Sequence, residues 1–344
     1  MAVTVQDIAR KVGVNSSTVS RVLNGYRNIS EETRRKVLDA ARELNYHPNS
    51  IARNLAKGSS ASIGVVLDAS NSEEFSNFFF SRSLFAIERA AQSYGYNVII
   101  SSSYKEGEKR SPIEDLVMQK QVDGLIVPPF ALDAHLLDVL NNMNFPYVFL
   151  GQPARSGLQV SWVDLHNAQG SAQAVAHLYE RGYQRICFLG GNPDAGFVKQ
   201  RITGYTDAIE AHQKPYVVNT KGTPESAEKA SYQALKNMEE KPDAFICCDN
   251  YTAFGLMSTI PTCLGTFTLK RLQLNVPKQV GIVTFDNFPL AEFMDPPLTA
   301  IDIDTDLLGE QCATMLFQRI EKPMPSQQML LSTTLIKRKS TERA

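Results

Sequence analysis

Hydrophobic residues in the first fifty positions recur at the spacing of short amphipathic helices. Three helices are predicted, after Thr4, Asn15 and Ser30, whose side chains can accept hydrogen bonds from the free N–H groups at a helix start. Gly13 separates the first two at a turn that suits a positive φ. The predicted buried faces are Ile8, Ala9 and Val12; Val19, Val22 and Leu23; and Val37, Leu38, Ala41 and Leu44. This spacing is typical of a helix-turn-helix unit.

From Ile63 onward, short apolar runs alternate with segments of helical periodicity. The runs that predict buried strands are IGVVLD, YNVIIS, GLIVPP, YVFLG, RICFLGG, AFICC and VGIVTFD. Helices are predicted over about 81–94, 111–121, 133–143, 168–181, 198–212 and 225–238. This alternation predicts parallel sheets covered by helices, with a crossing between two sheets near 151–163. Ligands of such sheets bind beyond the carboxyl ends of the strands.

The segment SIARNLAKGSS connects the two parts. Its apolar residues allow one or two turns of helix, which is too short to be stable alone in water. We therefore expect it to become ordered only when it binds something, while Gly58 and the serines after it provide a flexible link.

Composition and charge narrow the class of protein. The chain has 344 residues, 43% hydrophobic and 21% charged, as expected for a globular protein of two or three domains. Residues 1–60 carry ten Lys and Arg against five Asp and Glu, whereas the remainder carries 25 against 31. A basic head on an acidic body favours a polyanion as the partner of the head.

The stretch TVQDIARKVGVNSSTVSRVLNG, followed by YHPNSIARNLAKG, closely resembles the headpiece and hinge of the LacI/GalR family of bacterial transcription regulators. The resemblance implies that Ser16, Ser17 and Arg21 read bases in the major groove. It implies phosphate contacts for Thr4, Asn15, Ser20, Asn24, Asn28, Ser30 and Thr33. In the hinge it implies DNA contacts for Asn49, Ala52 and Leu55, of which Leu55 enters the minor groove as an apolar wedge.

The remaining chain is similar to the effector-binding core of the same family, through KQRITGY, CCDNYTAFG, VTFDN and DPPLTAIDID. The implied architecture is α/β: an all-α headpiece with a hinge helix, then a type I periplasmic-binding-protein-like core of two parallel-sheet subdomains. We expect the headpiece at 1–47, the hinge and linker at 48–62, and the core at 63–344. Its N-subdomain is expected at about 63–162 and 292–326, and its C-subdomain at about 163–291 and 327–340.

The same resemblance implies the effector-binding residues. Arg201, Asp249 and Asp286 match positions that hold ligand hydroxyls, which suits charged groups that make strong hydrogen bonds to vicinal hydroxyls. Phe79 and Trp162 are further candidates; for the FFF run at 78–80, a buried helix start is an equally good interpretation.

Two departures from the family pattern bear on the ligand. Gly151 stands where a lactose-type regulator has an aspartate, and Asn250 stands where a second acid is common. The combination of FLGQP, KQRITGY and SNFFF is most similar to maltose-type members, which makes a maltose-like glucoside the expected effector.

We therefore expect a cytoplasmic, homodimeric repressor of carbohydrate-utilisation genes that binds operator DNA and responds to a small sugar. The alternatives are a purine-type regulator that needs a corepressor, and a sugar-binding receptor, which would need a signal peptide and no headpiece. No catalytic motif, metal-ligand spacing, cofactor or membrane segment is predicted, so an enzyme is not expected. The five scattered cysteines favour reduced core thiols.

Overall fold

The computed structural model describes residues 3–26, 28–46, 58–67, 78–103, 111–153, 158–209, 214–237, 240–257, 274–287 and 289–343. The chain forms two compact units, Met1–Ser60 and Ala61–Ala344. Among the described helices, none is long and apolar enough to cross a membrane. Four cysteines, at 187, 247, 248 and 312, are buried and unpaired as predicted, whereas Cys263 lies outside the described residues.

The first unit contains the three predicted helices, α1 (Val5–Val12), α2 (Ser16–Leu23) and α3 (Glu31–Glu43). Asp7 Oδ2 accepts from Thr4 N–H at 2.9 Å, Ser30 Oγ accepts from Thr33 N–H at 3.3 Å, and Gly13 has φ 76°. Asn15 occupies the N-cap position of α2, but its side chain makes no capping hydrogen bond. The helices enclose a small core of Ile8, Ala9, Val19, Val22, Val37, Ala40 and Ala41.

Leu38 departs from the predicted buried face of α3. It is 37% exposed, and Ala40 is buried. The reason is helical geometry: Val37, Ala40, Ala41 and Leu44 follow the i, i+3, i+4, i+7 spacing of one face, and Leu38 lies about 100° away from Val37.

The second unit contains two six-stranded sheets. The first has the order β11-β5-β4-β3-β1-β2, and the pairings between its described strands are parallel. Its strands are β1 (Ser62–Leu67), β2 (Asn97–Ser102), β3 (Gly124–Val127), β4 (Tyr147–Leu150), β5 (Trp162–Leu165) and β11 (Gln328–Leu331). The helices beside it are α5 (Phe78–Ser93), α6 (Pro112–Met118), α7 (Ala134–Asn142) and α13 (Thr305–Glu321), with a short 3₁₀ turn at Pro129–Ala131.

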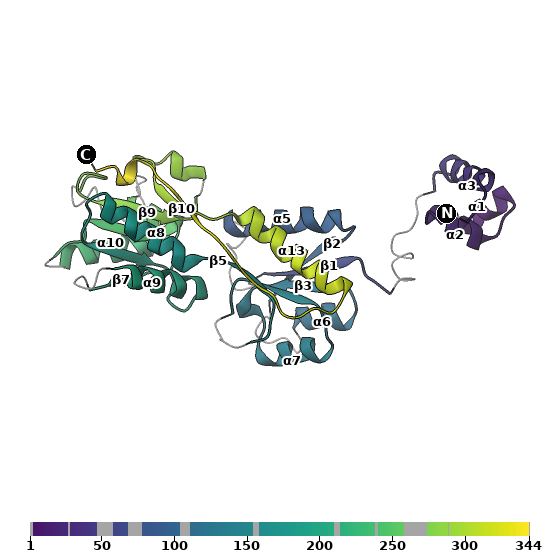
Figure 1. Cartoon of the computed structure of the whole chain (residues 1–344), viewed down its shortest axis with the longest axis horizontal. Helices are drawn as coiled ribbons and strands as arrows, with labels where there is room; N and C mark the ends of the chain where they lie inside the picture. The colour runs from purple at the N-terminus through teal and green to yellow at the C-terminus, as the bar shows by residue number, and fades with distance from the viewer. Residues whose placement is uncertain are drawn as a thin grey trace. The chain divides into compact units, whose positions relative to one another are not determined.

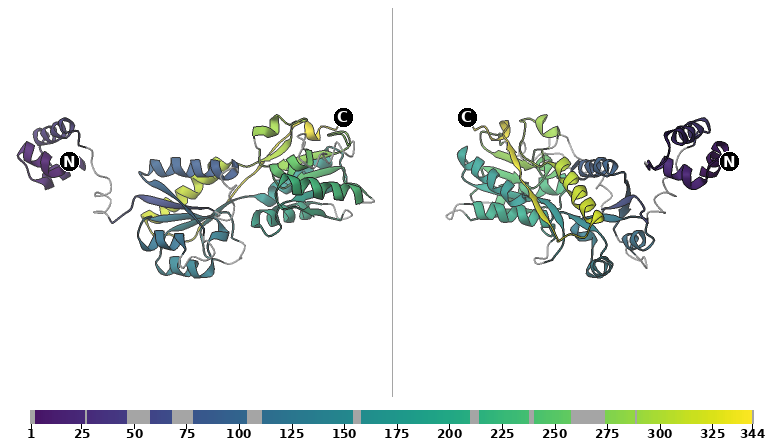
Figure 2. Two further views of the ribbon diagram at one scale, coloured as in Figure 1. Left: turned by 180° about the vertical axis from the view of Figure 1, so that it is seen from behind. Right: turned by 45° about the vertical axis from the view of Figure 1, so that its right-hand side comes forward.

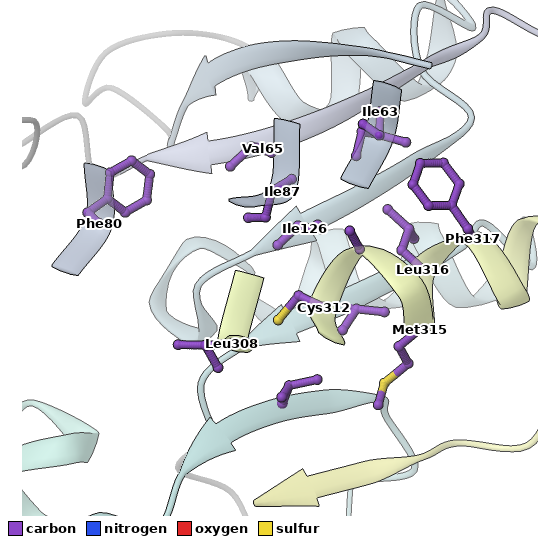
Figure 3. Packing of buried hydrophobic residues seen from close by; sticks show 14 of the residues in the cluster. Ile63, Val65, Phe80, Ile87, Ile126, Leu308, Cys312, Met315, Leu316 and Phe317 are labelled. Atoms are coloured by element: carbon purple, nitrogen blue, oxygen red, sulfur yellow. The ribbon is translucent and has the colours of Figure 1, made fainter. Parts of the chain in front are cut away.

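Helices cover both faces of this sheet (Figure 1). Alternate β1 residues face opposite sides, because strand side chains alternate: Val65 packs with α5 and α13, and Val66 packs with α6 and α7. Figure 3 shows the first of these clusters, where Phe80 and Ile87 of α5 and Leu308 of α13 lie over the sheet. Both faces are therefore buried, as a parallel sheet requires.

The second sheet has the order β12-β10-β9-β8-β6-β7, with β12 antiparallel to β10 and the other pairings parallel. Its strands are β6 (Ile186–Gly190), β7 (Tyr216–Asn219), β8 (Ala244–Cys247), β9 (Gly281–Phe285), β10 (Thr299–Asp302) and β12 (Thr334–Ile336). Its helices are α8 (Asn167–Glu180), α9 (Gly196–Ala208), α10 (Pro224–Asn237) and α11 (Asn250–Met257), with 3₁₀ turns at Pro289–Glu292 and Lys339–Thr341. Residues of α8 and α9 pack in one core cluster, and residues of α11 pack in another.

The subdomain boundaries differ from the predicted ones. Strands β5 and β11 pair in the first sheet, whereas the expected boundaries place 163–165 and 328–331 in the second subdomain. Strand β10, expected in the first subdomain, lies in the second sheet. The chain thus crosses between the sheets after β5, after β10 and after β11, and Figure 2 shows these segments from two sides. The prediction is wrong here because strand pairing joins residues more than 160 positions apart, and local periodicity carries no information about such pairs.

Candidate functional site

Arg201 is the centre of a cluster at the carboxyl edge of the second sheet. Its side chain is only 4% exposed, and its guanidinium bonds in three directions. Nε donates to Asn167 Oδ1 at 2.9 Å, Nη1 donates to the Cys248 carbonyl, and Nη2 donates to Asp286 Oδ1 at 3.4 Å. A buried cation is costly unless it is paired and hydrogen-bonded, and these partners meet that requirement.

Helix packing positions Arg201. Gly204 lies one turn after Arg201 on α9, and a Cβ there would lie 2.2 Å from the Ala168 carbonyl oxygen at the start of α8. Glycine therefore permits the close approach of α8 and α9 that brings Arg201 to Asn167, the first residue of α8. The G of the QRITGY motif is thus explained by packing.

Two aromatic rings flank the guanidinium. Arg201 Cζ lies 4.0 Å from the ring centroid of Phe285, which is fully buried, and 5.0 Å from that of Phe197, which is 44% exposed. Both distances are within the range of a cation–π contact. Phe197 therefore presents an accessible aromatic surface directly beside Arg201, and the sequence pattern did not single it out.

The two predicted carboxylates lie at the same edge. Asp286 directly follows β9 and has φ 67°, a left-handed conformation that is uncommon outside glycine. Burial raises the pKa of its carboxyl to about 6, although Arg201 opposes the shift, and the negative charge of Asp249 adds to it. Asp249 follows β8 and accepts from Thr252 N–H at 2.7 Å, so it also caps α11.

The three charged candidates, Arg201, Asp249 and Asp286, are thus brought together, but the two aromatic candidates are not placed with them. Trp162 is 6% exposed and packs in the cluster of α6 and α7 at the amino end of β5, so we leave it out of the site. Phe79 is half-buried in α5 and packs against the core of the first sheet, in agreement with the interpretation of FFF as a helix start.

Three side-chain amides also join this cluster, and the sequence pattern did not predict them. Asn167 and Gln200 bond to each other, and Gln200 also reaches Gln152 and Asp164. The position of Gln200 beside Arg201 in the KQRITGY motif was the available signal, but its partners are distant in sequence.

In the first unit, the surface predicted to contact DNA is open. The exposed candidates are Thr4, Asn15, Ser16, Ser17, Ser20, Arg21, Asn24, Asn28 and Ser30, and Thr33 is half-buried. Asn24 Nδ2 donates to Ser20 Oγ at 3.3 Å, which holds two of these polar groups side by side on α2. Asn49, Ala52 and Leu55 lie outside the described residues.

Comparison with known proteins gives a family for this arrangement. Residues 4–49 match the model of bacterial regulatory proteins of the lacI family, and residues 175–341 match that of a periplasmic binding protein-like domain. The HTH-type transcriptional repressor PurR of Proteus mirabilis (strain HI4320) is 30% identical over 343 residues, covering 98% of this chain and 96% of PurR. The chain belongs to the LacI family.

Two solved structures extend the match. This LacI-family chain is similar to the lac repressor dimer bound to operator and the anti-inducer ONPF, with a TM-score of 0.80, 26% identity and 99% coverage of both chains. It is also similar to the complex of the transcriptional regulator CelR with cellobiose, with a TM-score of 0.69, 27% identity, and coverage of 98% of this chain and 99% of CelR. The chain is therefore a DNA-binding transcriptional repressor with an effector-binding domain, and not an enzyme.

Proposed function

We propose that this repressor binds a palindromic operator as a homodimer, and that an uncharged sugar bound by Arg201, Asp249 and Asp286 lowers its operator affinity. We further propose that it acts in the cytoplasm, where its operator would be, and that it controls carbohydrate-utilisation genes. Its lac repressor relative is a dimer on operator DNA, which supports the first part of this proposal.

The unused hydrogen-bond donors and acceptors around Arg201 indicate the class of ligand. An arginine has five N–H donors, and the bonds to Asn167, Cys248 and Asp286 use three of them. Two donors remain for a ligand, beside two carboxylates that accept hydrogen bonds. Vicinal hydroxyls can both accept from such an arginine and donate to such carboxylates.

The charges around Arg201 disfavour anionic effectors. Asp249 and Asp286 supply two negative charges against the one positive charge of Arg201, which already contacts Asp286. A phosphorylated sugar would place its charge close to these carboxylates in a partly buried site, where repulsion is only weakly screened. An uncharged sugar meets no such cost, and the exposed ring of Phe197 can pack against the apolar face of a pyranose.

A maltose-like glucoside is our first choice among uncharged sugars. It rests on the similarity of FLGQP, KQRITGY and SNFFF to maltose-type members of the family. CelR, at 27% identity, was solved with the disaccharide cellobiose, which supports a ligand of this size.

For the DNA side, we propose that Ser16, Ser17 and Arg21 read bases and that the hinge at 48–62 orders on the operator. The three side chains are exposed on α2, which supports their proposed role in base recognition. Subdomain movement on ligand binding would then separate the two hinge segments of the dimer and weaken the complex.

The test is a thermal-shift screen of maltose, cellobiose, lactose, glucose and glucose 6-phosphate against the wild type and Arg201→Ala. A ligand at 100 times its Kd stabilises the folded state by about 2.7 kcal/mol. We expect an uncharged sugar to raise the Tm of the wild type only. A rise with the sugar phosphate alone would contradict the uncharged-ligand proposal.

A purine corepressor is the second candidate, because PurR of Proteus mirabilis is 30% identical to this chain. The two candidates differ in the sign of the response. Adding free purine bases to the same screen and to an operator titration separates them: a corepressor would strengthen operator binding, whereas the proposed sugar weakens it.

A further inference from the structure

Gln200 connects the first sheet to the surroundings of Arg201. Its Nε2 donates to Gln152 Oε1 at 2.9 Å and to Asp164 Oδ2 at 3.3 Å, and its Oε1 accepts from Asn167 Nδ2 at 2.8 Å. Gln152 follows β4 and Asp164 lies in β5, and both strands belong to the first sheet. Gln200 belongs to α9, which packs on the second sheet. One carboxamide thus bridges the two subdomains.

Asn167 continues this connection to Arg201. Its carboxamide is 2% exposed and is used on both sides, because Nδ2 donates to Gln200 and to the Leu165 carbonyl while Oδ1 accepts from Arg201 Nε. A buried amide with both ends bonded cannot rotate without losing several hydrogen bonds, each costly to leave unmade. The orientation of Arg201 is therefore tied to the position of Gln200.

Asp164 lies at the other end of this series of hydrogen bonds and is held by several donors. It is 8% exposed, and it accepts from the backbone N–H groups of Gln152 at 2.9 Å and Leu165 at 2.7 Å in addition to Gln200. A buried carboxylate is tolerated only when its lone pairs are satisfied. Rotation of the second subdomain about the crossing between Leu165 and Asn167 would stretch the bonds from Gln200 to Asp164 and Gln152.

We infer that Gln200 is a positioning residue that couples ligand contact at Arg201 to the angle between the two sheets. The inference rests on the proposed effector site. A ligand that draws the guanidinium toward itself moves Asn167 Oδ1 with it, and Gln200 transmits the change to Gln152 and Asp164. The bonds of Gln200 to Gln152 and Asp164 hold the two sheets at one angle.

The first test needs no ligand. Nitroxide labels at Asp138→Cys on α7 and Asp207→Cys on α9, both exposed positions, report the distance between the subdomains by pulsed electron spin resonance in the full-length chain. A Cys263→Ser background prevents labelling of the one cysteine that is outside the described residues. We expect Gln200→Ala to broaden the distance distribution, and Lys199→Ala, an exposed neighbour on the same helix, to leave it unchanged.

Gln200→Glu is the second variant. It keeps an oxygen that can accept from Asn167, but it loses the donor to Gln152 and places a negative charge against Asp164. We expect it to broaden the distribution as Gln200→Ala does while Arg201 remains oriented. Operator binding by each variant shows that it is folded. A distribution identical to that of the wild type in both variants would overturn the inference.

Maltose is then added as the probe, with binding followed by calorimetry. We expect maltose to shift the distance in the wild type and to bind Gln200→Glu without the same shift. Binding with an unaltered shift in that variant would overturn the inference and leave the effector site standing. If maltose fails to bind the wild type, the ligand proposal fails, while the ligand-free distances still decide the role of Gln200.

Discussion

The α-carbon of Gly204 on α9 faces the carbonyl of Ala168 on α8 so closely that an added Cβ would lie 2.2 Å from the oxygen. Contact with backbone cannot be relieved by moving a side chain, so Gly204→Ala must push the helices apart. We expect a loss of about 1–3 kcal/mol in the free energy of unfolding, and weaker effector binding because Arg201 moves with α9. Urea unfolding measures the first effect, with Thr203→Ala on the exposed side of α9 as the control. Equal stability of both variants would contradict this packing role.

Arg21→Ala tests base recognition by the headpiece. Arg21 is exposed in the last turn of α2, and a guanidinium reads guanine through two hydrogen bonds. We expect the variant to lose preference at one base pair of each half-site, by about 1–3 kcal/mol. Thr33→Ala is the matched control, since a phosphate contact weakens binding to all sequences alike. Selection from a random operator library measures both. An unchanged preference in Arg21→Ala would remove the assignment.

Leu55→Ala tests the hinge, and Leu55 itself lies outside the described residues. We predict that Leu55 enters the minor groove and partly unstacks the central base step, at a cost of a few kcal/mol that wider contact with the kinked DNA offsets. The variant should then bend the operator less and bind it more weakly, with an unchanged Tm without DNA. If Leu55 only packs against the core, the bend stays and the Tm falls, so bend angle and Tm are measured on the same variant.

We predict that the free energy of unfolding depends on pH through Asp286. Burial raises the pKa of its carboxyl to about 6 from 3.8, so the folded state favours the protonated form. The resulting stabilisation is fully present below about pH 4 and is lost as the pH rises through about 6, on the order of 3 kcal/mol in total. Asp286→Asn lacks this titration, and asparagine tolerates the left-handed φ of 67°. Urea unfolding of both proteins should show that the free energy of unfolding of the wild type falls, relative to that of Asp286→Asn, as the pH rises from about 4 to about 7. A difference independent of pH would contradict it.

Local periodicity predicted most elements close to their observed bounds. The predicted helix at 168–181 is α8 at Asn167–Glu180, and the helix at 133–143 is α7 at Ala134–Asn142. Strand β7 was missed because it is four residues long, half-exposed and at the edge of its sheet, so its apolar signal is weak. Helix α13 was not predicted either, although it packs on the first sheet and its Leu308 and Leu316 lie in the core.

For the candidate site too, local sequence predicts only some of the residues. Arg201, Asp249 and Asp286 were predicted because each belongs to a motif that is similar to the family pattern. The bonds of Gln200 to Gln152 and Asp164 were not, because they depend on a crossing of the chain between two sheets. Trp162 was a candidate for the site, but it packs with residues of α6 and α7, a neighbourhood that local sequence does not reveal.

In the proposed mechanism, an uncharged sugar controls operator affinity through Arg201. The direct measurement is a fluorescence-anisotropy titration of a selected operator with the wild type and Arg201→Ala, each with and without the sugar that raises the wild-type Tm. We predict that the sugar weakens wild-type binding by roughly 5- to 150-fold, and that Arg201→Ala binds the operator with wild-type affinity and ignores the sugar. Release of Arg201→Ala from the operator at the same sugar concentration as the wild type would contradict control through Arg201.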